Sequence, residues 1–310
     1  GDRPLDVMVQ TAGSTQGQRM LLKIVQETAR TDLDELGMPE PMRERLIALG
    51  ARPGLLIVSG LKGSGVTSTV YSLLRTHDAF MKQLATLEAR PSVDLENVTQ
   101  ITYADKAALP GQLAKLLRRD PDVAAVDLCP TTQVAKVITD AASEKSILLE
   151  MRAESSFKAL AQWVKVAGDA RQEAVSALHA VLCQVLLRKL CPACREAYQP
   201  PKELLARLNI PADKVDRFYR PPTQPLVDEK GNPRICETCR GTGYFGREGA
   251  FELLEVTDEI RQLVQDNAPL NQIKSACRKN KMLYLQEQGL RKVIAGQTSI
   301  EEVVRVSKQK

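Results

Sequence analysis

The chain has 310 residues, with 43 Lys or Arg against 38 Asp or Glu, and therefore a formal net charge of +5. Apolar residues make up 43% of it and aromatic residues 4%, a balance that excludes an intrinsically disordered chain and a collagen-like repeat. The small positive charge permits a phosphate-bearing ligand but does not by itself indicate nucleic acid. No apolar run reaches the roughly 18 residues that span a bilayer, so we expect no transmembrane segment.

The N-terminal residues predict a pair of strands. Residues 5–10 alternate between apolar and polar, a turn follows at 13–17, and residues 20–25 run back. Two strands alone are only marginally stable, so we expect residues 1–32 to be the strand-rich remnant of an N-terminal domain together with a linker.

From Leu55 onward, strands and helices are predicted in alternation. The continuous apolar run 55–59 has the profile of a buried parallel strand, and a helix is predicted over 67–75. Further strands are predicted at 83–87, 98–103, 123–126 and 147–151, with helices at 109–118 and 132–142. This alternation indicates a mainly parallel sheet that is covered on both faces.

The composition of the chain changes after Leu190. Before that point, residues 176–181 are expected to form an apolar helix in which His179 is packed. Two cysteine pairs, several prolines and a glycine-rich end then fill residues 191–249, which suggests an inserted subdomain. Helices are predicted from Thr257 onward, with a capping-box pattern at Ser299–Glu302.

A glycine-rich loop joins the strand at 55–59 to the helix that follows it. In loops of this kind, inward-facing backbone N–H groups and the positive end of the helix dipole hold phosphate groups. The phosphate-loop pattern G-x-x-x-x-G-K-[ST] is matched at Gly60, Gly65 and Thr67, but its lysine position holds Val66. From these residues alone, a tight strand-to-helix turn without a ligand remains an equal alternative.

Two C-x-x-C pairs form the second candidate site. Cys191 and Cys194, with Cys236 and Cys239, supply the four thiolates of a tetrahedral structural zinc site. In a large chain such pairs favour metal ligands over disulfides, so we expect a reducing, cytoplasmic compartment. The stretch 195–235 is longer than the roughly 15–20 residues usual between such pairs, and reduced cysteines without a metal are the alternative.

Four further segments strengthen a resemblance to a known family. Together with the glycine-rich loop and the cysteine pairs, the chain resembles the secretion ATPases of type II secretion and type IV pilus assembly, the GspE and PilB group. The segments are 120–126, 187–194, 236–249 and 289–303.

The resemblance implies an α/β fold divided into four parts. Residues 1–32 would be the remnant of a PAS-like N-terminal domain with its linker, and residues 33–190 a RecA-like P-loop NTPase core. A four-cysteine zinc subdomain would occupy residues 191–249, and a C-terminal helical subdomain residues 250–310.

Where the chain departs from the family, it loses catalytic groups. Val66 replaces the Walker A lysine, Leu128 replaces the Walker B glutamate, and Ala153 replaces the histidine of the His box. Glu88 matches the family's general base and is the candidate catalytic residue. Phosphoryl transfer is catalysed by positioning and by charge placed against developing negative oxygens, so we expect little or no ATP hydrolysis.

The family's nucleotide site is nevertheless expected to persist in part, with weak binding of ATP or ADP and Mg²⁺. Lys62 would supply a cation at the other end of the loop, and Asp127 would supply a Walker B carboxylate. The alternative for Lys62 is a solvated loop lysine. The expected nucleotide-binding set is Gly60, Lys62, Gly63, Ser64, Gly65, Val66, Thr67, Ser68 and Asp127.

These expectations favour a nucleotide-binding or scaffolding subunit over an active motor. It would sit in a hexameric or mixed ring on an inner-membrane secretion or pilus platform protein, in the cytoplasm and peripheral to that membrane. A slow but genuine ATPase is the first alternative. A zinc-containing nucleic-acid-binding module is the second, but the sequence lacks interleaved aromatic residues and a basic stripe, so we expect no nucleic-acid partner.

Overall fold

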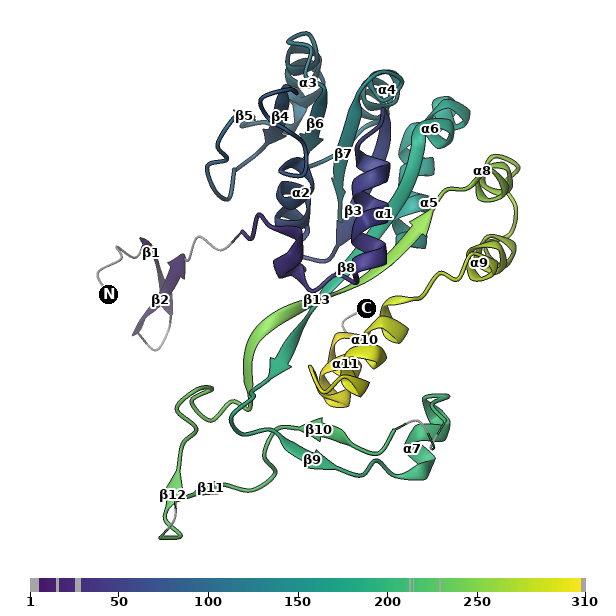
Figure 1. Cartoon of the computed structure of the whole chain (residues 1–310). Helices are drawn as coiled ribbons and strands as arrows, with labels where there is room; N and C mark the ends of the chain where they lie inside the picture. The colour runs from purple at the N-terminus through teal and green to yellow at the C-terminus, as the bar shows by residue number, and fades with distance from the viewer. Residues whose placement is uncertain are drawn as a thin grey trace.

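A seven-stranded sheet forms the centre of the molecule, in the order β13-β8-β3-β7-β6-β4-β5 (Figure 1). The computed structural model describes residues 6–14, 17–25, 29–211, 213, 215–228 and 230–307. Only β13 pairs antiparallel with its neighbour, and the other pairings in this sheet are parallel. The strands are β3 (Gly54–Gly60), β4 (Leu84–Glu88), β5 (Val98–Thr102), β6 (Val123–Val126), β7 (Ser146–Met151), β8 (Leu178–Leu190) and β13 (Tyr244–Glu255).

Helices bury both faces of this sheet. In β3, Leu56 and Val58 join one hydrophobic cluster with residues of α1 and α2, whereas Leu55 and Ile57 join another with residues of α3 to α6. The prediction of a mainly parallel sheet covered on both faces is therefore confirmed. The helices are α1 (Glu40–Gly50), α2 (Val66–Leu74), α3 (Leu109–Leu117), α4 (Thr132–Ala141), α5 (Ser156–Ala167) and α6 (Arg171–Ala177), with short 3-10 turns η1 (Leu33–Leu36), η2 (Lys106–Ala108) and η3 (Gly168–Ala170).

Two features of this core differ from the sequence-based expectation. Helix α1 was not predicted. The expected helix over 176–181 is wrong, because α6 ends at Ala177 and His179 lies in β8, between β3 and β13. A short apolar run fits a buried strand as well as a buried helix, and here pairing with two neighbouring strands decides for the strand.

The N-terminal pair of strands is present as predicted, in a sheet of its own. Strands β1 (Asp6–Ser14) and β2 (Gly17–Val25) pair antiparallel, with Val9 opposite Leu22. The side chains of both residues are more than half exposed.

The cysteine pairs lie beyond the end of the central sheet. There β8 and β13 continue as a long two-stranded ribbon that leads to a lobe of short elements (Figure 1). Because β13 runs from Tyr244 to Glu255, it crosses the expected boundary between residues 249 and 250. The lobe holds β9 (Glu196–Tyr198), α7 (Lys202–Arg207), β10 (Phe218–Arg220), β11 (Leu226–Val227) and β12 (Pro233–Arg234).

The chain ends in a series of helices after β13. Thr257 caps the first of them, because its side-chain oxygen accepts a hydrogen bond from the N–H of Ile260. Within the described part of the chain, no helix combines the length and apolar character needed to cross a membrane. The helices are α8 (Asp258–Gln265), α9 (Leu270–Lys279), α10 (Leu285–Ile294) and α11 (Ile300–Ser307).

Candidate functional site

The loop between β3 and α2 folds back tightly on itself. The N–H of Ser64 donates to the carbonyl of Leu61 at 3.0 Å, and Gly65, at the start of α2, has a left-handed φ of 85°. A Cβ on Gly60 would lie 2.1 Å from Ser64 Oγ and 2.8 Å from the carbonyl oxygen of Gln184, so this position requires glycine. No side chain caps the N-terminus of α2, which leaves its first N–H groups available to an anion.

A buried glutamine from β8 holds this loop in place. The amide of Gln184, which is 2% exposed, donates to the carbonyl of Ser64 at 2.9 Å and accepts from the hydroxyl of Thr69 at 2.7 Å. Gln184 was not predicted as a site residue. The available signal was a single amide within the apolar run 180–187 of this strand.

The predicted loop residues lie together in the structure, but no cationic side chain stands at the lysine position of the phosphate-loop pattern. Val66 is the first residue of α2 and packs against the hydrophobic cluster beneath that helix. Lys62 is exposed and forms no ion pair with any residue that the structure describes. The hydroxyl of Ser68 faces the preceding linker, where it accepts from the N–H of Arg30 at 3.1 Å.

Three acidic side chains meet beside α2 at the carboxyl ends of neighbouring strands. Glu88 ends β4, Asp127 follows β6, and Glu150 lies near the end of β7. Since β4, β6 and β7 are adjacent and parallel, their carboxyl ends share one edge of the sheet. Leu128 and Ala153, the predicted replacements for catalytic groups, pack against the core instead.

Each of these carboxylates has a distinct set of partners. Glu88 is 5% exposed and accepts from the hydroxyl of Tyr71 at 2.5 Å, while its other oxygen has no partner among the described residues. Asp127 accepts from the hydroxyl of Tyr103 and from the N–H of Ala89, both at 2.7 Å. Glu150 lies 3.3 Å from the hydroxyl of Thr67.

The electrostatics of this cluster are unfavourable to further negative charge. Burial, partly opposed by the Thr67 hydroxyl and reinforced by the charges of Asp127 and Glu88, raises the pKa of Glu150 to about 8. Burial also raises the pKa of Tyr71, and its hydrogen bond to Glu88 adds to the rise. The pKa of Tyr103 is raised in the same way, by burial and by its hydrogen bond to Asp127.

Sequence reasoning found part of this cluster and missed the rest. Glu88 and Asp127 were predicted to belong to the site, and both lie in the cluster. Glu150, Tyr71 and Tyr103 were not predicted. For Glu150, a signal was present: it is an acidic residue near the end of an apolar strand, in the segment aligned with the family's His box.

A cavity of about 200 Å³ opens on the other side of the first turn of α2. Arg30 and Arg247 line it together with Gly65, Ser68 and Gln184. Both arginines are exposed. The loop therefore contributes to this cavity, whose charged lining residues are Arg30, Arg247 and Glu248, as well as lying beside the acidic cluster.

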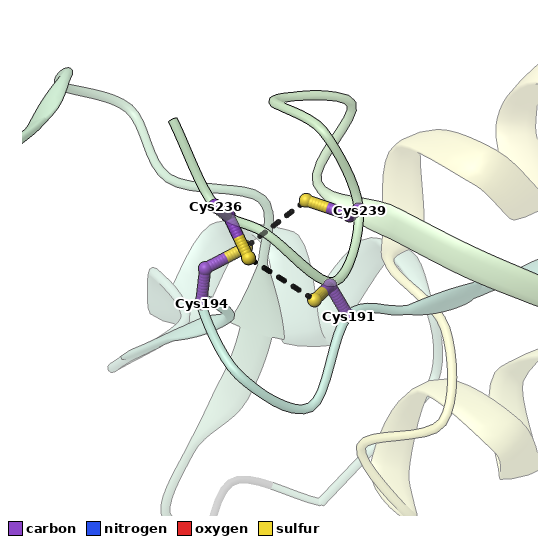
Figure 2. A group of neighbouring side chains, drawn as sticks. All are labelled: Cys191, Cys194, Cys236 and Cys239. Carbon is purple, nitrogen blue, oxygen red and sulfur yellow. Dashed lines mark hydrogen bonds between the residues drawn. The ribbon is translucent and has the colours of Figure 1, made fainter. Parts of the chain in front are cut away.

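The four cysteines of the two C-x-x-C pairs converge in the lobe (Figure 2). Their sulfur atoms all lie within 4.8 Å of one another, and all four residues are buried. The Sγ atoms are 3.8 Å apart between Cys191 and Cys236, and 3.6 Å apart between Cys194 and Cys239. These separations are too long for disulfides and match the edge of about 3.8 Å of a tetrahedron with metal–sulfur bonds of about 2.3 Å.

A backbone donor favours the thiolate form of Cys239, whereas burial and the neighbouring thiols raise the pKa of Cys194. The N–H of Gly243 donates to Sγ of Cys239 at 3.3 Å. Burial acts to raise the pKa of Cys239, but this N–H and the neighbouring thiols outweigh it and lower the pKa below its usual range. Thiolate is the form that binds metals, so the four residues could hold a metal ion.

Comparison with known proteins gives a match over almost the whole chain. The family model described as "Type II/IV secretion system protein" matches residues 1–305. The chain is 31% identical over 314 aligned positions to "Type II secretion system protein E" of Dickeya dadantii, covering 100% of this chain and 60% of that protein. It is 27% identical to "Type IV pilus assembly ATPase PilB" of Pseudomonas aeruginosa, covering 99% of this chain and 53% of that protein.

The fold is also similar to that of solved structures. The Legionella pneumophila ATPase DotB superposes with a TM-score of 0.66 at 13% identity, covering 99% of this chain and 73% of DotB. At that identity the similarity concerns the fold. The chain spans about 60% of the length of the Dickeya relative.

Proposed function

The chain belongs to the type II/IV secretion system protein family, and we propose that it is a GspE- and PilB-like subunit with a degenerate nucleotide site. It would bind nucleotide weakly or act as a scaffold, with little or no ATP hydrolysis. One observation carries this proposal: Val66 opens α2 where the phosphate loop of this family has lysine, and the charged groups beside it are carboxylates.

The rate cost of losing several charge-stabilising groups favours a loss of ATP hydrolysis. Removing one group that stabilises the developing charge commonly costs roughly 10²–10³ in rate. Here an aliphatic or small side chain stands at three such positions, Val66, Leu128 and Ala153. Even with non-additive effects, hydrolysis near the uncatalysed rate is expected.

Weak binding of nucleotide is supported by what remains of the loop. The backbone from Gly60 to Ser68, with the uncapped start of α2, would hold phosphate oxygens, and Lys62 would add a distant cation. Thr67 and Asp127 would be the residues that hold Mg²⁺. That ion supplies the positive charge which the loop itself lacks.

For the cysteine lobe we propose a structural zinc site made by Cys191, Cys194, Cys236 and Cys239. The tetrahedral separations of their sulfur atoms support it. In this proposal the chain consists of an N-terminal remnant, a RecA-like P-loop core, a zinc subdomain and a C-terminal helical subdomain, as the resemblance implies.

The proposed assembly follows from the family. Relatives are named as type II secretion and type IV pilus assembly proteins, so the chain would act at an inner-membrane platform protein of such a system, from the cytoplasm. A homo-oligomeric or mixed ring, hexameric in the simplest case, is the form we propose.

A slow ATPase is the second candidate, because Glu88 is buried at the end of β4 with one carboxylate oxygen that has no partner among the described residues. Phosphate release from ATP and Mg²⁺ by the purified chain separates the two. The proposal expects release at the rate of a protein-free blank. Release above the blank that Glu88→Gln abolishes and the exposed-site control Glu96→Gln retains would establish the slow ATPase instead.

A further inference from the structure

The carboxyl group of Glu150 accepts a hydrogen bond from the hydroxyl of Thr67, at the start of the helix that follows the loop. Strand β7 lies directly beside β3, with Glu150 opposite Val58, two residues before Gly60. Thr67 is the second residue of α2, and its hydroxyl lies 3.3 Å from Oε2 of Glu150. A ligand that binds the Thr67 hydroxyl therefore competes with this carboxyl group.

The hydrogen-bond partners of Glu150 differ from those of Asp127 and Glu88. Asp127 is fixed by Tyr103 and by a backbone N–H, and Glu88 is fixed by Tyr71. Within the described part of the chain, the Thr67 hydroxyl is the hydrogen-bond partner found for Glu150. Its position is thus set by the group that a phosphate or a cation would also use.

We propose that Glu150, when it is ionised, bars phosphate groups from the loop unless a divalent cation accompanies them. In this role it is a specificity-determining residue of the nucleotide site, and the inference rests on the nucleotide-binding version of the proposed function.

The physical reason is the charge around the loop. Burial and the neighbouring Asp127 and Glu88 raise the pKa of Glu150 to about 8, so its carboxyl is mostly neutral at pH 7 and ionised at pH 9, where phosphates would add more negative charge in the same partly buried space. Val66 provides no compensating cation, and Lys62 points to solvent. A divalent cation between the phosphates and the carboxylates would convert this repulsion into attraction on both sides.

The test is equilibrium binding of a fluorescent ADP analogue at pH 9, where Glu150 is ionised, followed by anisotropy in Mg²⁺ and, separately, in EDTA, with a second series at pH 7. Wild type is expected to bind weakly in Mg²⁺ and far more weakly in EDTA. Glu150→Gln keeps the size and the bond to Thr67 without the charge. In EDTA it should tighten binding by up to about tenfold at pH 9, because wild type can avoid the repulsion by taking up a proton at that cost, and it should change binding little at pH 7. Glu150→Ser should do at least as well, because it also frees Thr67.

Glu154→Gln is the matched control. Glu154 lies four residues after Glu150 and is ion-paired with Lys158. The affinity of the Glu154→Gln variant for the ADP analogue should therefore equal that of wild type, both in Mg²⁺ and in EDTA. Circular dichroism and melting temperature establish that each variant is folded. Equal dependence on Mg²⁺ in wild type and Glu150→Gln at pH 9 would overturn the inference, and so would absence of binding in all variants. Neither result touches the scaffold form of the proposed function, which fails separately if wild type releases phosphate briskly.

Discussion

Gly60 ends β3 at a point where the following loop returns to within contact distance of its own strand. The Ser64 side chain and the carbonyl of Gln184 fill the space that a Cβ would need. The loop can therefore adopt this conformation only because residue 60 is a glycine and has no side chain. At the same scale, one hydroxyl of Thr67 and one carboxyl of Glu150 decide what the loop presents to a ligand.

The first prediction concerns Gly60→Ala. The added methyl group would meet a backbone carbonyl at 2.8 Å, so β8 or the loop must shift, and we expect the free energy of unfolding to fall by roughly 1–3 kcal/mol. Urea denaturation measures this change. The control is Gly111→Ala in α3, where nothing lies within 4 Å of the added Cβ and stability should rise by about 0.5–1 kcal/mol. Equal effects at both sites would contradict the packing described for Gly60.

At the scale of elements, a buried carboxylate joins α11 to β8. The side chain of Glu302 is fully buried and accepts from Arg188 of β8 and from Arg305 of its own helix. The predicted capping-box pattern is realised only in part. The hydroxyl of Ser299 accepts from the N–H of Glu302, but the carboxylate of Glu302 turns to the two arginines. Burial alone would raise the pKa of Glu302, but the arginines outweigh it and lower the pKa to about 2.

The second prediction follows from this lowered pKa. A carboxylate with a folded pKa below its unfolded value stabilises the fold above about pH 4.5, and this contribution is lost as the pH falls toward 2. Glu302→Gln should therefore reduce the free energy of unfolding by roughly 3 kcal/mol at pH 7, and by progressively less in acid. Denaturation series at pH 7, 4 and 3 measure the difference. The exposed neighbour Glu301 gives the control Glu301→Gln, and a gap from wild type that does not shrink in acid would refute the argument.

At the scale of the whole molecule, the sheet and the cysteine lobe have separate cores. Two large clusters cover the faces of the sheet, and the sole tryptophan, Trp163, is fully buried in one of them. The cluster around the cysteines holds only those four residues and a partly buried Leu226, among the residues described. The part of the lobe around the cysteines therefore has little apolar burial of its own, whereas Leu205 of α7 and Phe218 of β10 join another cluster with residues of α10 and α11. The ribbon of β8 and β13 connects the lobe to the sheet.

The third prediction separates these two parts. Removing bound metal with a chelator should abolish hydrogen-exchange protection in residues 191–243 first, because structural zinc contributes on the order of 10 kcal/mol to such folds. Protection should persist from Tyr244 onward, where β13 pairs with β8. The emission of Trp163, whose indole N–H donates to the carbonyl of Ala174, should stay that of a buried indole.

Cys239→Ser should reproduce the loss of protection, whereas Cys129→Ser, at a thiol outside the cluster, should not. Metal analysis that finds no zinc near one equivalent would remove the proposed site. A red shift of the Trp163 emission on chelation would instead show that the lobe and the sheet unfold together.

Local patterns in the sequence determined much of this protein. The apolar run at 55–59, the glycine-rich loop and the paired cysteines are signals within a few residues, and periodicity or spacing is enough to interpret them. The family resemblance added the roles proposed for the positions that Val66 and Glu88 occupy. The α/β class with a mainly parallel sheet follows from the order of such signals along the chain.

Only the tertiary structure decided which distant residues meet. Glu150 reaches Thr67 across 83 positions of sequence because β7 lies beside β3, and no local pattern specifies that neighbour. His179 lies in a strand because β8 pairs on both sides, which outweighs the helical reading of a short apolar run. Contacts between elements depend on the order of strands in the sheet, and that order is set by packing of the whole chain.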